Sequence, residues 1–340
     1  MTQSAAGSRV RDVGALRRWL IRPEAAAVAG SILVFVFFAI AAGDSGFLTS
    51  GGTASYLAVA AQLGIVAVPV SLLMISGEFD LSVGSMVGAA GMIMAVTVVE
   101  YGLPLIVGIV LAFAVALAVG LFNGYVVVRT GLPSFIVTLG MLFALRGLTI
   151  GFARLLTGRT QIGMGSEVSE SPLTPLFAGT LGEFSVSIIW WVGLALLGTW
   201  VLQRTVFGNW VFGAGGNANA ARNVGVPVSR VKITLFVCTS LSAALLATIQ
   251  VLDAGSADVL RGELLELQAI AAAVIGGVLL TGGYGTVVGA LFGALIFGMV
   301  QQGIFFTGVN TDWFQVFVGV MLLVAVLFNN FIRKRASEAR

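Results

Sequence analysis

Long apolar runs separated by short polar segments follow one another along almost the whole chain of 340 residues. Runs of about 17 or more apolar residues are typical of membrane-spanning helices. The pattern therefore predicts an all-α polytopic membrane protein with about ten transmembrane helices. The predicted spans are 25–42, 54–75, 83–99, 103–127, 133–153, 186–202, 231–252, 267–280, 286–306 and 312–330.

The composition agrees with this pattern. Hydrophobic residues make up 58% of the chain and charged residues only 10%, whereas soluble domains average about 25% charged residues. The 45 glycines fit the same class, because small residues let membrane helices approach one another closely. The net charge of +3 comes from basic residues beside the span ends, so no nucleic-acid partner is expected.

The positions of Lys and Arg predict the orientation. With the N-terminus inside, fourteen basic residues fall in cytoplasmic segments, three (Arg154, Arg159 and Arg261) fall outside, and Arg146 lies within a span. This bias predicts cytoplasmic N- and C-termini. The expected organisation is a cytoplasmic tail 1–24, a transmembrane domain 25–330 that includes a cytoplasmic loop 203–230, and a cytoplasmic tail 331–340.

Several kinds of chemistry are excluded by residues that the sequence lacks. There is no histidine, which removes the commonest general base, most transition-metal sites and any Ser-His-Asp arrangement. The single Cys238 allows neither a disulfide framework nor a zinc site. No GxxxxGK[ST] motif for ATP binding is present. We expect no catalytic residue, no metal site and no cofactor in this chain, and an integral membrane enzyme is poorly supported.

The segment Gln203–Lys232 is the long polar interruption in the second half of the chain. Asn217 is a suitable N-cap, so a short helix is predicted over Ala218–Val224, with Gly225 at the left-handed stop position and Pro227 beyond it. A helix this short is far below the roughly 12–15 residues that are marginally stable alone in water. We therefore favour a docking surface for another protein over an inert loop.

Two carboxylates lie in a break between spans, in the stretch MISGEFDLSVGSMVGAAG. Glu78 and Asp80 are surrounded by Gly and Ser, and Ser82 and Ser85 follow at the start of the next span. Non-helical backbone at membrane depth must be buried in protein or line water, and an ionisable residue there needs a cavity or a partner. The segment 76–82 is either a broken element beside a polar path or a short inner loop in which Asp80 or Ser82 caps the next helix.

Polar side chains within spans can line a path for a hydroxyl-rich solute, because each can donate or accept hydrogen bonds. They can equally join helices, at about 0.6 kcal/mol each. Arg146 differs, since a cation inside a span needs a partner or water unless it reaches outward to the interface. The candidate path residues are Glu78, Asp80, Ser82, Ser85, Asn123, Thr138, Arg146, Gln268 and Gln301.

Two outer loops, Leu155–Ser185 and Asp253–Glu266, carry most of their charge as Asp and Glu. They are either ordinary solvated loops or an acidic rim for a partner with a basic edge. An internal echo links Ile75–Ala89 with Ile275–Ala290, with one residue inserted and a glycine-punctuated break before a helix in both. Internal repeats occur in transporters, but glycine-rich segments also match by chance.

Several stretches in order resemble one family. FGNWVFGAGGNANAARNVGVPVSRVK is similar to the coupling-helix loop of membrane permeases from bacterial ABC importers for simple sugars, of the ribose, xylose and fructose type. GEFDLSVGSMVGAAG resembles that family's GGIDLSVG signature, with Glu78-Phe79 where Gly-Ile is more usual. FNGYVVVRTGLPSFIVTLGMLFALRGL and IAAAVIGGVLLTGGYGTVVGALFGALIFGMVQQGI also match. The resemblance covers residues 50–330, and the departure at Glu78 leaves the substrate open.

This resemblance implies a type II-like ABC importer permease in the bacterial inner (cell) membrane, related to the ten-span vitamin B12 importer permeases. Such a permease pairs with a second permease copy, usually as a homodimer in membrane lipid, and the path runs between the two. The implied partners are a cytoplasmic ABC ATPase, often with two fused nucleotide-binding domains, which binds ATP and Mg, and a periplasmic or lipid-anchored sugar-binding protein. Coupling to the ATPase falls to Gly215, Gly216, Asn217, Ala220, Ala221, Arg222, Gly225, Val226 and Arg230.

Two alternatives stay open. The same architecture also suits a permease for a nucleoside, an amino acid or a signalling sugar derivative, because related permeases carry these solutes. An ion-coupled secondary transporter needs membrane carboxylates, for which Glu78 and Asp80 are the candidates. The requirement for ATP distinguishes this second alternative from an ABC permease.

Overall fold

The computed structural model describes residues 23–317 apart from 166, 167, 169 and 170, together with 319, 320, 323, 324 and 327. Nearly all of the predicted tail 1–24, all of the tail 331–340 and eight residues of the predicted span 312–330 lie outside the described residues. In chain order the main helices are α2 (Pro23–Ala42), α3 (Ser50–Ile75), α4 (Val83–Val99), α5 (Leu105–Thr130), α6 (Ser134–Thr157), α9 (Ser187–Arg204), α10 (Val206–Gly216), α11 (Ala218–Asn223), α12 (Val228–Ala254), α13 (Leu265–Ile275) and α14 (Val287–Phe306).

Six helices of the described chain are long and apolar enough to cross a membrane: α2 with the π-helical turn η1 (Gly43–Phe47), α3, α5, α6, α12 and α14. The prediction of an all-α multi-span membrane protein is confirmed. Helices α4 and α13 are apolar but shorter, with 17 and 11 residues. The predicted helix 267–280 is wrong at its end, because α13 stops at Ile275 and a non-helical turn follows.

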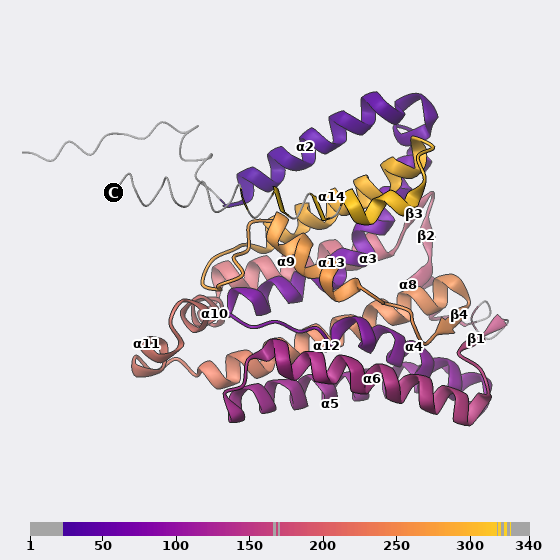
Figure 1. Ribbon diagram of the computed structural model, residues 1–340. Helices are drawn as coiled ribbons and strands as arrows, with labels where there is room; N and C mark the ends of the chain where they lie inside the picture. Colours follow the sequence, from indigo (N-terminus) through magenta and orange to yellow (C-terminus); the bar gives the residue numbers. More distant parts are fainter. Residues whose placement is uncertain are drawn as a thin grey trace, which may run out of the picture.

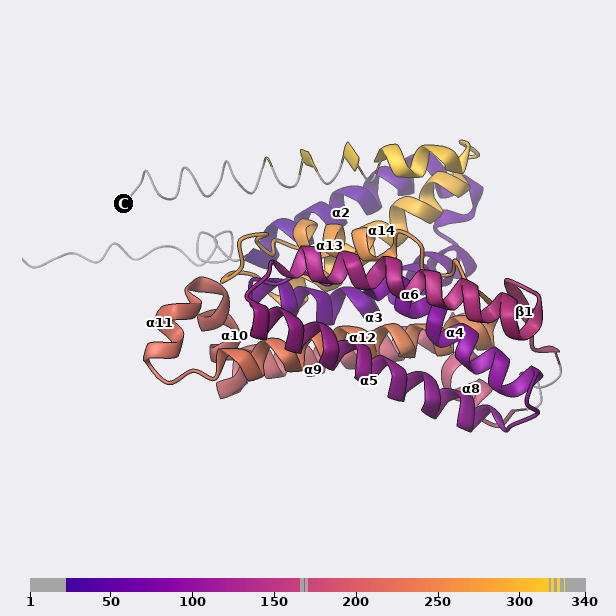
Figure 2. The ribbon, with the colours of Figure 1, turned by 60° about the horizontal axis from the view of Figure 1, so that its bottom comes forward.

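The long helices run between two ends of the molecule (Figure 1). We call them the island end, which carries α10 and α11, and the hairpin end, which carries β1 (Gln161–Gly163) and β4 (Ser256–Asp258). Figure 2 shows the same two ends from a second direction. At the hairpin end β1 pairs antiparallel with β4 in the register Gln161↔Asp258, so the two acidic loops predicted from the sequence are joined.

Smaller elements complete the hairpin end. A five-residue helix α8 (Thr174–Ala178) precedes β2 (Thr180–Leu181) and β3 (Phe184–Ser185), which form a second antiparallel pair. A short 3₁₀ turn, η2 (Thr311–Trp313), follows α14. Glu167 and Glu170 of the predicted acidic loop lie outside the described residues.

The core lies around α3 and α12. In their most apolar windows 83% of α3 and 72% of α12 are buried, against 22% of α6, so α3 and α12 are central and α6 is peripheral. Large apolar side chains point outward from the peripheral helices, for example Leu33, Ile40, Phe143 and Leu155. Such side chains cover the surface of a chain whose solvent is lipid rather than water.

Helix α4 begins inside the protein rather than at one of its ends. The non-helical segment 76–82 leads into it from α3 at the island end, and Ser76, Asp80 and Ser82 are fully buried. The segment 259–264 leads into α13 from the opposite, hairpin end (Figure 1). Segment 259–264 contacts the first half of α4, because its carbonyl oxygens lie against Gly84 and Gly88 of that helix. Segment 76–82 is therefore a broken element buried in protein rather than a plain loop.

The internal echo has a matching backbone geometry. Gly77 (φ 86°) and Gly277 (φ 90°) both adopt the left-handed conformation that ends a helix. Gly77 N donates to Met74 O and Gly277 N donates to Val274 O, both at 2.9 Å. The inserted length differs from the predicted single residue, because α4 starts eight positions after Ile75 and α14 twelve positions after Ile275.

Candidate functional site

The predicted short helix of the polar island is present. Helix α11 covers Ala218–Asn223, and Asn217 Oδ1 accepts from Ala220 N at 2.9 Å as the N-cap. Gly225 is left-handed (φ 90°), as the stop signal predicts. Within α11 only Ala221 is buried, so the helix stands at the tip of the island end with most of its surface uncovered (Figure 1).

The other predicted coupling residues lie around this helix. Arg222 donates to Asn219 Oδ1 at 3.0 Å and is exposed, as are Ala220 and Arg230. Val226 N donates to Ala221 O at 3.0 Å and returns the chain toward α12. Ala221 packs toward Gly213, so its role is to seat α11 on α10 rather than to face a partner.

A second island helix, α10, escaped sequence reasoning. Its N-cap is Thr205, whose hydroxyl accepts from Gly208 N at 3.3 Å, and its buried residues include Val211 and Ala214. The sequence does contain an N-cap residue followed by apolar residues. However, the glycines and polar neighbours of this segment are typical of a loop, so no helix was predicted there. Helix α10 connects the exposed helix α11 to the body of the protein.

The last turn of α10 lies against two glycine-containing breaks. Gly215 packs against the Ile75 carbonyl and against Gly77, at the end of α3. Gly283 N, in the turn 276–286, donates to the same Ile75 carbonyl at 2.8 Å. Side chains are absent from both sides of this contact, so backbone meets backbone. The island therefore contacts both breaks without an intervening side chain.

A buried hydrogen-bond network holds the break before α4. Asp80 Oδ1 accepts from the Ser82 hydroxyl at 2.6 Å and from Ser82 N at 3.0 Å. Asp80 Oδ2 accepts from the Thr239 hydroxyl of α12 at 2.6 Å, and Asn123 of α5 donates to the Ser82 hydroxyl at 2.9 Å. All four side chains are fully buried. The network therefore ties the break to α5 and α12.

Glu78, the departure from the family pattern, has a partner. Its carboxylate forms an ion pair with the Lys232 ammonium at the start of α12. The two side chains are only 11% and 15% exposed, so neither charge is mainly solvated by water. The added charge is thus neutralised locally by the chain itself and links the break to the island.

Removal of Lys232 alone should be damaging. We expect Lys232→Met to lower the free energy of unfolding by about 3 kcal/mol, because it leaves a buried carboxylate without its countercharge. The double variant Lys232→Met/Glu78→Gln should recover most of this loss. Thermal melts of the purified variants in detergent measure both the loss in the single variant and the recovery in the double variant. Additive losses in the double variant would contradict a direct pair.

The remaining predicted path residues have different surroundings. Thr138 is buried and its hydroxyl donates to Ser134 O at 2.8 Å, and the Ser85 hydroxyl donates to Leu142 O at 3.0 Å. Gln268 is half-buried on α13, whereas Gln301 is exposed on α14. The arginine within a span is paired rather than directed to the interface: Arg146 Nη1 lies 3.3 Å from Glu263 Oε1.

Sequence reasoning missed several residues of these networks. Thr239 is an Asp80 partner, and Gln250 of α12 donates to Gln62 of α3 at 3.0 Å. Each is a polar residue in an apolar run, the same signal that identified Asn123, so they could have been included. Val224, the last residue of the predicted short helix, is apolar and 81% exposed.

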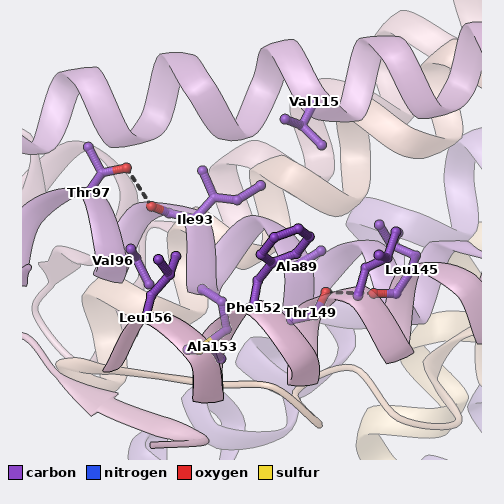
Figure 3. A pocket seen from close by; sticks show the side chains of 12 residues that line it. Ala89, Ile93, Val96, Thr97, Val115, Leu145, Thr149, Phe152, Ala153 and Leu156 are labelled. Atoms are coloured by element: carbon purple, nitrogen blue, oxygen red, sulfur yellow. Dashed lines mark hydrogen bonds between the residues drawn. The ribbon is translucent and has the colours of Figure 1, made fainter. Parts of the chain in front are cut away.

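An apolar groove of about 400 Å³ lies between α4, α5 and α6 (Figure 3). Its two hydroxyls are used within their own helices: Thr97 donates to Ile93 O at 2.6 Å and Thr149 to Leu145 O at 2.7 Å. The rest of its lining is apolar, including Phe152 and Leu156. Both hydroxyl protons of the groove are thus already donated and its lining is mainly apolar, so it does not suit a hydroxyl-rich solute.

The multi-span helical body, its buried breaks and its exposed island are those of a polytopic membrane protein. The chain belongs to the family described as branched-chain amino acid transport system / permease component, whose model matches residues 52–326. It is therefore a multi-pass membrane permease. No solved structure matches the chain.

Relatives of known description cover nearly all of the chain. The xylose transport system permease protein XylH of Escherichia coli K12 is 30% identical over 91% of this chain and 92% of its own length. The fructose import permease protein FrcC of Rhizobium meliloti is 30% identical over 93% of this chain and 87% of its own. The probable ABC transporter permease protein YphD of Escherichia coli K12 is 31% identical over 91% and 90%, respectively.

Proposed function

We propose that the chain is the permease subunit of an ATP-driven importer of monosaccharides in the bacterial cell membrane. The island end faces the cytoplasm, and there α11 docks on an ABC ATPase that hydrolyses ATP. The chain crosses the membrane in ten segments and pairs with a second permease copy, usually its own, to form the path. A sugar-binding protein delivers the solute to the hairpin end.

The observation that carries this proposal is the form of the island. A capped six-residue helix stands exposed at one end, and its supporting helix α10 makes backbone contact with both breaks of the membrane domain. Ala221 packs this helix on α10, and the other residues of the helix leave their surface uncovered for a partner. An ATPase that moves α11 would move Gly215 and, with it, the ends of α3 and of the turn 276–286.

The assignment of a sugar as the solute is supported by two relatives, which are described as a xylose permease and a fructose permease. The family description names branched-chain amino acids instead, so the cargo is the finer part of the proposal. Substrate choice also depends on the binding protein, because that subunit selects the solute before the permease meets it. Uptake assays should therefore include L-leucine beside D-xylose, D-fructose and D-ribose.

Contact with the ATPase can be tested by cross-linking. In a background with Cys238→Ser, we expect Val224→Cys to form a high-yield cross-link to the proposed ABC ATPase, because Val224 is apolar and 81% exposed beside α11. The matched control is Leu181→Cys, which is 63% exposed in the β2–β3 pair at the opposite end and should not react. Membranes are treated with a short cross-linker that joins the introduced thiol to an amine of the partner, and capture is read on denaturing gels.

Both outcomes of this cross-linking bear on the orientation. A Val224 product confirms a cytoplasmic island that contacts the ATPase. Cross-linking of Leu181→Cys in place of Val224→Cys would contradict both the docking surface and the orientation. Labelling of intact cells with an impermeant maleimide gives an independent check, since only the hairpin-end cysteine should be reached from outside.

A further inference from the structure

The apolar groove between α4, α5 and α6 has a closed floor and an open rim (Figure 3). The floor is lined by side chains that are almost fully buried, namely Ala89, Met92, Leu145 and Ala153. The rim is lined by side chains of α6 that are about half exposed, namely Leu148 (55%), Phe152 (56%) and Leu156 (48%). Helix α6 is peripheral, so the groove is open toward the surroundings of the helical body, which in a membrane are lipid.

The groove has the length of one membrane leaflet. Along α6 its lining runs from Leu145 to Leu156, which is about 16 Å at a rise of about 1.5 Å per residue. Half of a hydrocarbon core of about 30 Å is about 15 Å. Since α6 covers Ser134–Thr157, the groove begins near the middle of this helix and reaches its hairpin end. This is the range of depths that one acyl chain of the leaflet at the hairpin end occupies.

The lining suits a flexible hydrocarbon chain better than a second helix. Helices approach one another closely in a membrane where they carry small residues. The glycines of α6 lie outside the groove, and a Cβ at Gly140, Gly147 or Gly151 would meet nothing within 4 Å, so a helix would find its close approach there instead. A hydrocarbon chain needs no hydrogen bond, and both hydroxyls of the groove already donate within their own helices.

Exposed charges lie at the end of α6 that the groove reaches. Arg154 is in the last turn of α6, and Arg159 follows the left-handed cap Gly158. At the end of α4, Glu100 and Tyr101 are exposed as well, and tyrosine is typical of the membrane–water interface. Two guanidinium groups against one carboxylate leave a net positive charge among these side chains. Such a surface favours a phosphate group, which arginine binds through charge-assisted hydrogen bonds.

We propose that a phospholipid of the leaflet at the hairpin end binds here, with one acyl chain in the groove and its phosphate at Arg154 and Arg159. The acyl chain makes dispersion contacts with the floor of the groove that α4, α5 and α6 do not supply to one another. The lipid thereby holds α4, the helix that follows the buried break 76–82, against α6. The inference goes beyond the proposed import function and does not depend on which solute is carried.

The test uses the full-length protein in nanodiscs that contain a phosphatidylglycerol with a photoreactive diazirine in one acyl chain. After illumination, the peptides that carry the lipid are located by mass spectrometry, and we expect them to come from the lining of the groove. Val115→Trp should lower this labelling about tenfold, because Val115 points into the groove from α5 and an indole there takes the place of the acyl chain (Figure 3). Leu117→Trp is the matched control, since Leu117 is 43% exposed on the same helix and does not line the groove.

A second variant leaves the interior of the protein untouched. The double variant Arg154→Gln/Arg159→Gln should also lower labelling about tenfold, because each basic residue near the membrane surface contributes to binding of the phosphate. A photoreactive diacylglycerol, which has the same chains and no phosphate, should label the wild type as weakly as phosphatidylglycerol labels this variant.

Three results would overturn the lipid site. The first is equal labelling of Val115→Trp and Leu117→Trp, and the second is label spread evenly over all outward-facing helices. The third concerns a second copy of the chain as the occupant: in a Cys238→Ser background, Leu148→Cys at the rim would then form disulfide-linked dimers in place of lipid adducts. The assay needs neither ATPase nor solute, so its outcome is independent of whether the protein imports a sugar.

Discussion

Replacing Gly215 with Ala should lower ATP-driven uptake by about tenfold, which corresponds to ~1.4 kcal/mol of lost coupling. A Cβ at this position would overlap the Ile75 carbonyl, which also accepts from Gly283 N. The last turn of α10 would then be pushed away from both breaks. ATP hydrolysis by the partner should continue, because α11 itself is unchanged.

The matched control is Gly216→Ala, one residue further along α10. A Cβ there meets nothing within 4 Å. Replacing either glycine with alanine stabilises the helical backbone by a similar amount, about 0.5–1 kcal/mol. The two variants therefore differ in the overlap with the Ile75 carbonyl, which only the Gly215 variant has. The measurement is the ratio of solute taken up to ATP hydrolysed in proteoliposomes. Equal ratios for the two variants would show that the glycine contact does not transmit the movement.

Asp80→Ala should have the largest effect on stability. It removes a fully buried carboxylate that accepts three hydrogen bonds from Ser82 and Thr239. The Ser82 hydroxyl loses its acceptor, whereas the Thr239 hydroxyl keeps the Phe236 carbonyl at 2.8 Å. Hydrogen bonds to charged groups contribute about 1.5–3 kcal/mol each, and unpaired buried partners add to the loss. We expect the free energy of unfolding to fall by ~3 kcal/mol or more and uptake to disappear.

The milder Asp80→Asn variant keeps the shape of the side chain and should still impair uptake more than Asp258→Asn. Asp258 lies in β4 at the hairpin end, where its Oδ1 accepts from Leu260 N at 2.7 Å. Thermal melts in detergent and uptake in cells are measured for both variants. An Asp258→Asn variant that is as impaired as Asp80→Asn would show that the buried network has no special role.

The sequence was sufficient for the periodic parts of the fold. Apolar runs located nine helices among the described residues, and capping residues located α11 to within one residue at its end. Local signals sufficed there because a helix end is specified by its own cap. The tails stay predictions because nearly all of their residues lie outside those described, and the span 312–330 stays a prediction because gaps interrupt its described residues.

The sequence did not reveal the contacts between distant segments. Nothing near Glu78 indicates Lys232, and nothing near Arg146 indicates Glu263, since each pair joins segments more than 100 residues apart. The packing of Gly215 on Ile75 is equally non-local. The sequence shows that the chain is rich in glycine. The role of each glycine, however, depends on which backbone segments the fold brings into contact with it.

The ion-coupled alternative is weakened by the surroundings of its carboxylates. Glu78 is paired with Lys232, and Asp80 accepts hydrogen bonds from two hydroxyls and one backbone N–H. Both carboxylates therefore already have partners within the described part of the chain. The family membership, which is that of transport-system permeases, supports the ATP-driven interpretation.

The energy source tests the central claim most directly. Proteoliposomes that contain this chain, its ATPase and its binding protein are loaded with ATP, and uptake of labelled D-xylose, D-fructose and D-ribose is followed with and without an ionophore. We predict uptake of at least one sugar that requires ATP and the binding protein and is unaffected by the ionophore. Uptake that persists without ATP and collapses with the ionophore would contradict the account.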